Sequence, residues 1–331
     1  MNSDIAPAIE VTNLTKRYAE VIAVNDISFQ VDHGELFGFL GPNGAGKTTT
    51  INMLTGLARL DAGRIKISGI DCTRNPKAAQ HLTGIVPDES NLYPELTGFD
   101  NLCFCAALYG IRKSERQQRA QELLESFGLN DAAHRKFAGY SKGMKRKLTF
   151  AAGIIHQPSI LFLDEPTTGI DVGSARQVRQ IIADLHRKGT TIFLTTHYIE
   201  EAERLCERIA FIVDGRIVRT DRTVDLLQPV KGKNVLLLSV SNSGVNLSEA
   251  MAMAFPQYHF QSATNEQIRV ESAEPVSVGP LVHFLEDRGI QVTEARRHLP
   301  SLEDVFVQVT GIEAGLMLRE KEKVGGGGGN Q

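Results

Sequence analysis

The fold is decided by the stretch Gly41-Pro42-Asn43-Gly44-Ala45-Gly46-Lys47-Thr48, which fits the pattern G-x-x-x-x-G-K-[ST] of a phosphate-binding loop. An apolar stretch from Leu36 to Leu40, which predicts a buried strand, precedes it, and a helical pattern follows it. The glycines let backbone N–H groups surround a phosphate, and the N-terminus of the helix adds partial positive charge. We expect Lys47 to reach the β- and γ-phosphates and Thr48 to bind Mg²⁺. A dinucleotide fingerprint is excluded, because its third glycine would fall at Thr49.

Two further apolar strands are expected to end at the same edge of the sheet. The run from Ile160 leads into Asp164 and Glu165, and the run from Thr190 leads into His197. Asp164 is then placed to bind Mg²⁺, Glu165 to face the water that attacks the γ-phosphate, and His197 to contact that phosphate. A strand that ends in Asp-Glu is by itself more often a solvated turn, and a lone histidine is more often structural. The phosphate-binding loop upstream favours the functional interpretation of both.

Composition and charge exclude several classes of protein. The chain has 331 residues, 36 Lys+Arg against 39 Asp+Glu, and 42% hydrophobic residues, which is ordinary for a folded protein with room for two domains. The net charge of −3 offers no electrostatic case for nucleic acid. The longest apolar run, Leu102 to Tyr109, is too short to cross a bilayer, and no secretory signal is recognisable, so a cytoplasmic location is expected. Neither a disulfide framework nor a zinc site is expected from four scattered cysteines: Cys72, Cys103, Cys105 and Cys206.

The alternation of strand and helix patterns from Ile9 to about Leu227 predicts an α/β domain with a mostly parallel sheet, over residues 1–228. A small antiparallel edge is expected before the first helix, from strands at Ile9–Asn13, Val21–Val24 and Ile27–Val31. The order βαββαβ over residues 229–323 predicts a small α+β, ferredoxin-like domain. The glycine-rich residues 324–331 are expected to be a disordered tail.

With these motifs, the chain resembles a known family, the ATP-binding subunits of ABC transporters, over roughly Ile9 to Leu227. The resemblance implies a P-loop NTPase fold with a helical signature subdomain at about residues 89–157. The end of the chain from Pro300 to Phe306 is similar to that of the ABC-type-2 exporters, which include drug-resistance and polysaccharide-export ATPases. The family's motifs match here at Tyr18 (the aromatic that stacks on adenine), Gly41–Thr49 (Walker A), Ser141, Lys142, Gly143 and Met144 (signature), Asp164 and Glu165 (Walker B), Asp171 (D-loop) and His197 (switch histidine).

The resemblance implies an ATPase that powers a membrane exporter. Two copies would pair head to tail, with each ATP between the Walker A loop of one chain and the signature segment of the other. Glu165, His197 and Lys47 would be the catalytic residues, and Mg²⁺ would be held by Thr48, Asp164 and Asp88. The other partner would be a transmembrane permease, which would hold the chain at the cytoplasmic face of the membrane.

The chain departs from the family pattern in the Q-loop and in the signature. Asp88 stands where most members have the Q-loop glutamine, so an oxygen ligand is kept but now carries a charge. In the signature, Lys142 replaces a glycine and Met144 replaces a glutamine. We expect Lys142 to add a cation near the γ-phosphate bound by the second copy and to tighten the ATP-bound dimer, at some cost to its helix through the dipole.

Two segments have more than one interpretation. The apolar segment Leu92 to Ile111 is helical core by composition, and the resemblance places a coupling surface for the permease near Asp88 and Tyr93. A solvated helix face is favoured over contact with phosphate or lipid headgroups for a basic stretch that contains Arg135, Lys136, Lys142, Lys145, Arg146 and Lys147.

Two alternative functions stay open. The first is an ABC protein that acts on ribosomes or in gene regulation; such proteins usually carry two cassettes, and here the Walker A motif occurs once. The second is a free-standing P-loop kinase of a small metabolite, which would need a lid for the acceptor and would have no use for the signature segment.

Overall fold

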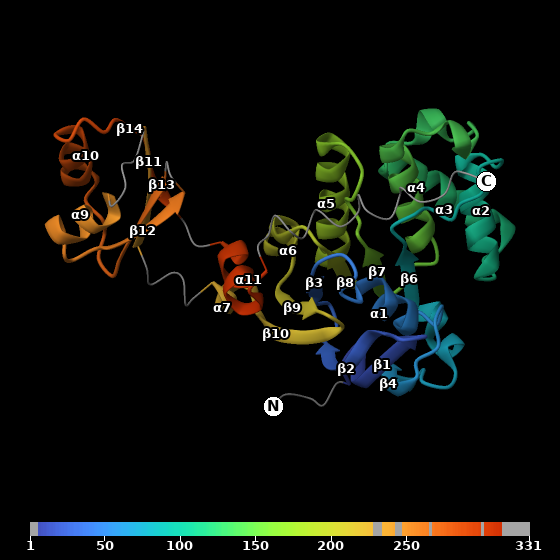
Figure 1. The fold of residues 1–331 in the computed structure, drawn as a ribbon. Coiled ribbons are helices and arrows are strands. Elements are labelled where there is room, and N and C mark those ends of the chain that lie inside the picture. The colour runs from blue at the N-terminus through green and yellow to red at the C-terminus, as the bar shows by residue number, and fades with distance from the viewer. Residues whose placement is uncertain (1–5, 228–233, 242–246, 265–266, 299–300, 313–331) are drawn as a thin grey trace, which may run out of the picture. The chain divides into compact units, whose positions relative to one another are not determined.

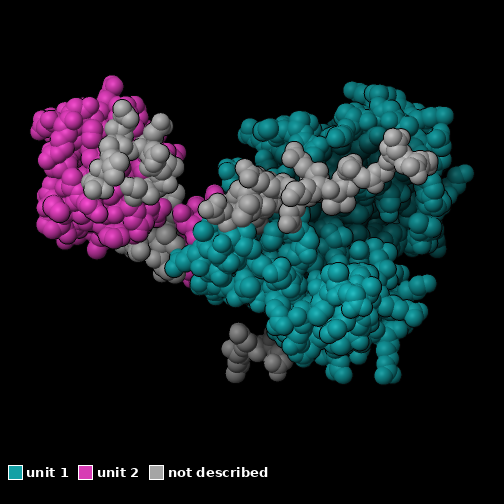
Figure 2. Space-filling view, viewed as in Figure 1, with its two compact units in different colours: residues 1–223, 306–331 teal, residues 224–305 magenta. Residues whose placement is uncertain are grey.

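The computed structural model describes residues 6–227, 234–241, 247–264, 267–298 and 301–312 (Figure 1). The chain forms two compact units, residues 1–223 together with 306–331, and residues 224–305 (Figure 2). The segment at which we expected a domain boundary, residues 229–233, and the glycine-rich tail at 324–331 lie outside the described residues.

A six-stranded sheet forms the centre of the first unit. Five of its strands are parallel, and only the hairpin partner at one edge, β10, is antiparallel. Because both faces of the parallel strands are covered, these strands are almost continuous apolar runs. The strand order is β10 (Arg216–Arg222), β9 (Arg208–Val213), β3 (Leu36–Leu40), β8 (Thr191–Thr196), β7 (Ile160–Asp164) and β6 (Thr83–Val86).

The parallel register brings the predicted motifs to one edge of this sheet. Leu40, at the end of β3, pairs with Thr196, and Thr195 pairs with Asp164 at the end of β7. The loops that follow these strands therefore meet at the carboxyl ends, where ligands bind in open α/β sheets. The helices that follow the loops are α1 (Lys47–Leu54), α5 (Val172–Arg187) and α6 (Ile199–Leu205), and the short helix α7 (Thr223–Leu226) comes after β10.

The antiparallel strands expected near the N-terminus are present, but they form a sheet of their own. The expected pair Val21–Val24 and Ile27–Val31 is one strand, because Asp26 adopts a left-handed backbone with φ 56° and carries the chain through an irregularity. Phe29 of this sheet packs its ring 5.8 Å from Phe37 and 5.6 Å from Phe193 of the central sheet. The strand order is β2 (Val21–Val31), β1 (Ile9–Tyr18), β4 (Ala62–Ile67) and β5 (Ile70–Asp71).

A helical segment separates β6 from β7. Its helices are α2 (Gly98–Leu108), α3 (Lys113–Ser126) and α4 (Lys142–Ile154). Within the apolar segment 92–111, Leu102 and Ala106 are fully buried, whereas Leu108 is 70% exposed. The helical-core interpretation is therefore confirmed for the buried face of α2, and the coupling surface stays a prediction for its exposed face.

The second unit has the expected order βαββαβ, and its strands are all antiparallel to their neighbours. This order and pairing confirm the ferredoxin-like fold. The strand order is β12 (His259–Thr264), β13 (Gln267–Ser272), β11 (Asn234–Val240) and β14 (Val292–His298), with helices α9 (Leu247–Ala254) and α10 (Val278–Glu286). The last described helix, α11 (Leu302–Thr310), enters the first unit at Phe306, whose ring lies 5.3 Å from that of Phe211.

No helix within the described ranges is long and apolar enough to span a membrane.

Candidate functional site

The phosphate-binding loop has the geometry that its glycines predict. Gly46 has φ 100°, and a β-carbon there would lie 2.3 Å from the carbonyl oxygen of Ala23. A β-carbon at Gly41 would lie 2.1 Å from the carbonyl oxygen of Ile212. Both positions therefore require glycine, because any other residue would push the loop away from its neighbours.

Lys47 begins α1, and its ammonium group is held inside the loop. Nζ donates hydrogen bonds to the carbonyl oxygens of Gly41 at 2.7 Å and Pro42 at 3.0 Å. The first turn of α1 contains no acidic residue of its own that would offset the positive end of the helix dipole. Thr48 is exposed in that turn, and Asn43, Gly44, Ala45 and Thr49 complete the loop and the turn. The loop and the turn together can bind a phosphate group.

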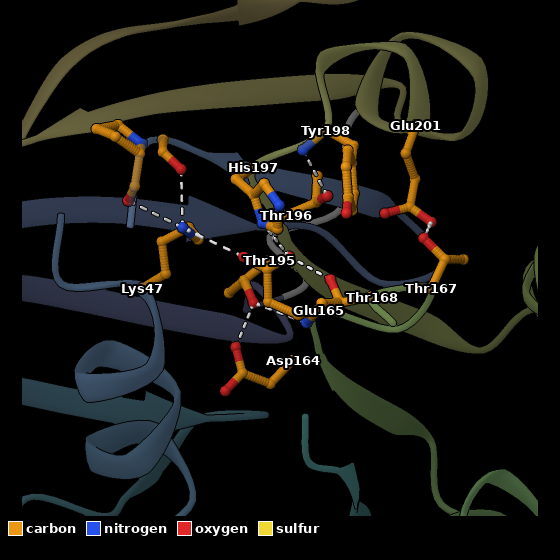
Figure 3. Close-up of polar contacts among 12 residues, drawn as sticks. Lys47, Asp164, Glu165, Thr167, Thr168, Thr195, Thr196, His197, Tyr198 and Glu201 are labelled. Carbon is orange, nitrogen blue, oxygen red and sulfur yellow. Dashed lines mark hydrogen bonds and ion pairs between the residues drawn. The ribbon is translucent and has the colours of Figure 1, made fainter. Parts of the chain in front are cut away.

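Glu165 is the centre of the polar contacts at the end of β7 (Figure 3). Its Oε2 lies 2.7 Å from Nδ1 of His197 and accepts a hydrogen bond of 3.1 Å from Oγ1 of Thr168. Its Oε1 forms an ion pair with Nζ of Lys47 at 3.2 Å. The structure therefore brings together three residues that the sequence assigned to one site.

The electrostatics of the site keep Glu165 ionised. Burial raises the pKa of Glu165, but the hydrogen bond from His197 and the positive charge of Lys47 outweigh it, and the net pKa lies below the ordinary value. The carboxylate is consequently charged at neutral pH and can accept a proton.

The backbone of Glu165 is strained. Its φ of 48° lies in the left-handed region, which costs a residue with a side chain about 1–3 kcal/mol. The backbone N–H donates to the carbonyl oxygen of Thr195 at 3.1 Å, which helps to hold the turn in this conformation. Such strain is typical of functional sites, where the surrounding structure fixes the direction of one side chain.

Asp164, one residue earlier, lies at the sheet edge beside β8. Its Oδ1 accepts a hydrogen bond of 2.5 Å from Oγ1 of Thr195. Asp88, the replacement for the Q-loop glutamine, is half-buried and follows β6, which pairs in parallel with β7. Both aspartates therefore belong to the same edge of the sheet as the phosphate-binding loop.

Tyr18 ends strand β1 and is 48% exposed. It pairs with Val21 of β2, and the same hairpin brings Ala23 against Gly46 of the loop. Nζ of Lys16 lies 5.2 Å from the centre of the Tyr18 ring. The ring is thus an exposed aromatic surface on the strand pair that adjoins the loop.

The signature segment forms the N-terminus of α4. Ser141 caps the helix, and its Oγ accepts a hydrogen bond of 3.3 Å from the N–H of Met144. Ser141 and Lys142 are exposed, whereas a β-carbon at Gly143 would lie 2.1 Å from Oγ of Ser174 in α5. Gly143 therefore allows α4 to approach α5 closely.

Asp171 has the capping role that its position at the start of α5 predicts. Its Oδ1 accepts from the N–H of Ser174 at 2.9 Å, and its Oδ2 accepts from the hydroxyl of Ser174 at 2.6 Å. These two hydrogen bonds lower the pKa of the exposed Asp171 carboxyl, so it is charged at neutral pH.

Sequence reasoning assigned Arg146 to a solvated helix face, and this interpretation is wrong. Arg146 is only 6% exposed, and its guanidinium contacts the segments that follow β6 and β7. Helical periodicity contains a signal for this, because Gly143, Arg146, Phe150 and Gly153 recur at helical spacing and all four are buried.

Glu201 in α6 is a second residue that sequence reasoning missed. Its Oε1 accepts a hydrogen bond of 2.8 Å from Oγ1 of Thr167, two residues after Glu165. Its Oε2 is buried, and no hydrogen-bond partner for this oxygen occurs in the described part of the chain. Burial raises the pKa of Glu201. The only signal in the sequence is the spacing of four residues from His197.

Comparisons with known proteins identify the family of the chain. The family model described as ABC transporter matches residues 24–168. The chain is 37% identical over 314 residues to the linearmycin resistance ATP-binding protein LnrL of Bacillus subtilis, which covers 92% of this chain and 98% of that protein. It is 36% identical over 311 residues to the Nod factor export ATP-binding protein I of Burkholderia orbicola, which covers 93% of this chain and 98% of that protein.

Solved structures show the same fold. An ATP-binding subunit of an ABC transporter superimposes with a TM-score of 0.62 at 30% identity, covering 67% of this chain and 93% of that chain. A dimeric ATP-binding cassette in a post-hydrolysis state bound to ADP and Pi superimposes with a TM-score of 0.61 at 25% identity, covering 65% of this chain and 98% of that chain.

Proposed function

Because the chain belongs to the ABC transporter family, as an ATP-binding subunit of the export type, we propose that Glu165 is the general base of the ATP hydrolysis that powers export. One observation carries this proposal. The ionised carboxylate of Glu165 is held between His197 and Lys47 at the end of the sheet where the phosphate-binding loop lies. A carboxylate in that place can orient a water molecule toward the γ-phosphate and accept its proton.

The remaining residues of the loop bind the nucleotide. Lys47 stabilises the negative charge on the transferring phosphoryl group, and the N–H groups between Gly41 and Thr49 surround the β- and γ-phosphates. His197 orients Glu165 and contacts the γ-phosphate. Tyr18 stacks on the adenine ring, which its exposed aromatic face allows.

Mg²⁺ would be held by Thr48 and Asp164, with Asp88 nearby. Hydroxyl and carboxylate oxygens are ligands that Mg²⁺ prefers, and the ion keeps water and substrate phosphates in its remaining positions. Asp164 fits this role because it offers carboxylate oxygens at the sheet edge, one of which is oriented by Thr195. When bound, the ion neutralises phosphate charge.

A second copy of the chain completes each site. Ser141, Lys142, Gly143 and Met144 form a helix N-terminus whose first residues are exposed, so they are available to the γ-phosphate bound by another subunit. Asp171, exposed at the start of α5, lies across the same interface. The solved cassette that resembles this chain is itself a dimer, which supports a head-to-tail pair.

The other partner is a transmembrane permease, which holds the chain at the cytoplasmic face of the membrane. The names of the relatives support this proposal, since they describe ATP-binding proteins for resistance or for export. A candidate surface for that partner is the exposed side of α2, where the ring of Phe104 makes an edge contact at 5.1 Å with Tyr93, which precedes the helix.

The proposal is tested by ATP hydrolysis with the purified full-length chain and its Glu165→Gln variant. The wild type should hydrolyse ATP without any added metabolite. Glu165→Gln should bind ATP, accumulate as a dimer on size-exclusion chromatography and hydrolyse about 10²-fold more slowly. Near-normal turnover in Glu165→Gln would contradict the proposal that Glu165 is the general base. Phosphate transfer only in the presence of an acceptor would favour the kinase alternative.

A second experiment tests the permease. The tagged chain, extracted from membranes of its host in mild detergent, should copurify with a polytopic membrane protein in near-equal amount. Recovery from the soluble fraction with ribosomal proteins would instead favour the alternative in which the chain acts on ribosomes.

A further inference from the structure

The guanidinium of Arg146 is the most heavily hydrogen-bonded side chain near the site. A guanidinium has five N–H groups, and here five backbone carbonyl oxygens surround it. The acceptors are Pro166 (from Nε, 2.7 Å), Asp164 and Glu165 (from Nη2, 2.9 and 3.1 Å), and Asp88 and Pro87 (from Nη1, 2.9 Å for Asp88). Each N–H group can therefore have one carbonyl partner, although the side chain is almost completely buried.

These carbonyls belong to two segments that are far apart in the sequence. Residues 164–166 form the strained turn that contains Glu165, and residues 87–88 follow β6 at the edge of the sheet. Arg146 itself lies in the second turn of α4, the helix that Ser141 caps. One side chain thus joins the signature helix, the turn that contains Glu165 and the segment in which Asp88 stands at the position of the Q-loop glutamine.

The hydrogen bonds hold the turn on both sides of Glu165. The carbonyls of Asp164, Glu165 and Pro166 all accept from Arg146, and the N–H of Glu165 donates to Thr195. A left-handed residue keeps its conformation only when its surroundings hold it. The direction in which the Glu165 side chain leaves the backbone, toward His197, therefore depends on the guanidinium.

We propose that Arg146 is a positioning residue that couples the signature helix to the catalytic turn and to the segment at Asp88. When the second copy and its ATP contact Ser141 at the start of α4, any shift of that helix moves the carbonyls that hold Glu165 and those that flank Asp88. The two nucleotide sites and the permease-facing segment then respond together. This inference rests on the proposed function, since it assigns a role within the same site.

Only an arginine can provide this connection. Lysine carries the same charge but has three donors on a flexible stem, so it can satisfy at most three of the five carbonyls and cannot span both segments as a planar fork. Burial lowers the pKa of the Arg146 guanidinium, and the nearby carboxylates of Asp88, Asp164, Glu201 and Glu165 oppose this shift by favouring the charged form. Arg146→Lys therefore tests the fork geometry with the charge retained.

The chain offers a matched control in Arg208. Its Nε and Nη2 donate to the carboxylate of Glu35 at 2.8 and 3.0 Å, so it also joins separate segments by several hydrogen bonds. Neither Arg208 nor Glu35 belongs to the nucleotide site. Arg208→Lys measures what the loss of such a connection does to the fold alone.

The experiment compares wild type, Arg146→Lys and Arg208→Lys as full-length chains. The readouts are thermal unfolding, the Kd of a fluorescent ATP analogue, and the kcat, KM and Hill coefficient of ATP hydrolysis. Both variants should unfold at lower temperature than the wild type. Only Arg146→Lys should lose about tenfold or more in kcat, because a displaced catalytic group slows the reaction steeply, with the Kd within about threefold of wild type. Its Hill coefficient should fall toward one.

An unchanged kcat in Arg146→Lys, or an equal loss in Arg208→Lys, would overturn the inference. Arg146→Gln, which removes the buried charge and keeps an amide donor, is used if Arg146→Lys does not fold, and the same outcomes apply. The proposed function fails separately, if the wild type itself does not hydrolyse ATP or if Glu165→Gln remains active.

Discussion

Nδ1 of His197 lies 2.7 Å from Oε2 of Glu165, and the two residues follow neighbouring parallel strands whose ends are in register at Asp164 and Thr195. The imidazole N–H donates to the carboxylate, since a charged carboxylate can only accept. His197 therefore orients Glu165 and helps to keep it ionised, and we propose that it also contacts a nucleotide phosphate.

Replacement of His197 by alanine should separate these effects. His197→Ala removes the hydrogen bond that orients Glu165, so kcat should fall by about 10²-fold. Binding of ADP, which lacks the γ-phosphate, should be unchanged in isothermal titration. Tyr198→Phe is the control, because it keeps the ring that packs 4.1 Å from the imidazole. Full activity in His197→Ala would show that Glu165 does not need to be oriented by His197.

Gly46→Ala should destabilise the phosphate-binding loop more than Gly44→Ala. Both glycines have positive φ, 100° and 84°, so each alanine pays backbone strain of about 1–3 kcal/mol. At Gly46 the new β-carbon also meets the carbonyl oxygen of Ala23 at 2.3 Å, whereas nothing lies within 4 Å at Gly44. Urea unfolding without nucleotide should rank the two variants in that order. An equal loss of unfolding free energy in the two variants would mean that the loop moves away from Ala23 at no cost.

Glu201→Gln should stabilise the chain at neutral pH. Burial raises the pKa of Glu201 above the ordinary value of 4.5, so the folded chain holds this proton more tightly than the unfolded chain. The free energy of unfolding of the wild type therefore falls as pH rises from 4.5 through the folded pKa, while the amide is unaffected. We expect Glu201→Gln to be the more stable chain at pH 7, because burial penalises a carboxyl group that can ionise more than it penalises a neutral amide.

Unfolding of both chains by urea at several pH values tests this expectation. The advantage of Glu201→Gln should disappear below about pH 4.5, where Glu201 is protonated in both states. A stability advantage of Glu201→Gln that grows as the pH falls would contradict the raised pKa of Glu201 in the folded chain. Since the amide oxygen can still accept from Thr167, the ATPase activity should change little.

Lys142→Gly should weaken ATP-driven dimerisation at low salt. Lys142 is the first residue of α4, where a cation opposes the helix dipole by about 0.3–1 kcal/mol. Its benefit would come from the phosphate of the second copy, and such an attraction between exposed charges is screened by salt. The difference from wild type, measured by sedimentation, should disappear at 1 M salt. Unchanged dimerisation of Lys142→Gly at low salt would contradict the proposed contact of Lys142 with the phosphate of the second copy.

Much of the fold could be predicted, because its determinants are local. The strand Leu36–Leu40 and a helix after the phosphate-binding loop were predicted from apolar runs and from the loop between them. Both are present, and the helix spans Lys47–Leu54. The βαββαβ order of the second unit followed from alternating periodicities in the same way. The antiparallel sheet was harder, since the break at Asp26 looks like a strand end in the sequence but is an irregularity within one strand.

By itself, the sequence determined the family, the type of fold and the identity of the groups that meet at the sheet edge, since motif spacing and parallel strands leave few alternatives. The tertiary structure alone decided which of those groups interact. The spacing of buried positions within α4 indicates a buried side for Arg146, but it cannot indicate the carbonyls about 20 and 60 positions away in the sequence that bind its guanidinium. A charged side chain is stable inside a protein only where distant segments supply its hydrogen-bond partners, and that arrangement exists only in the folded chain.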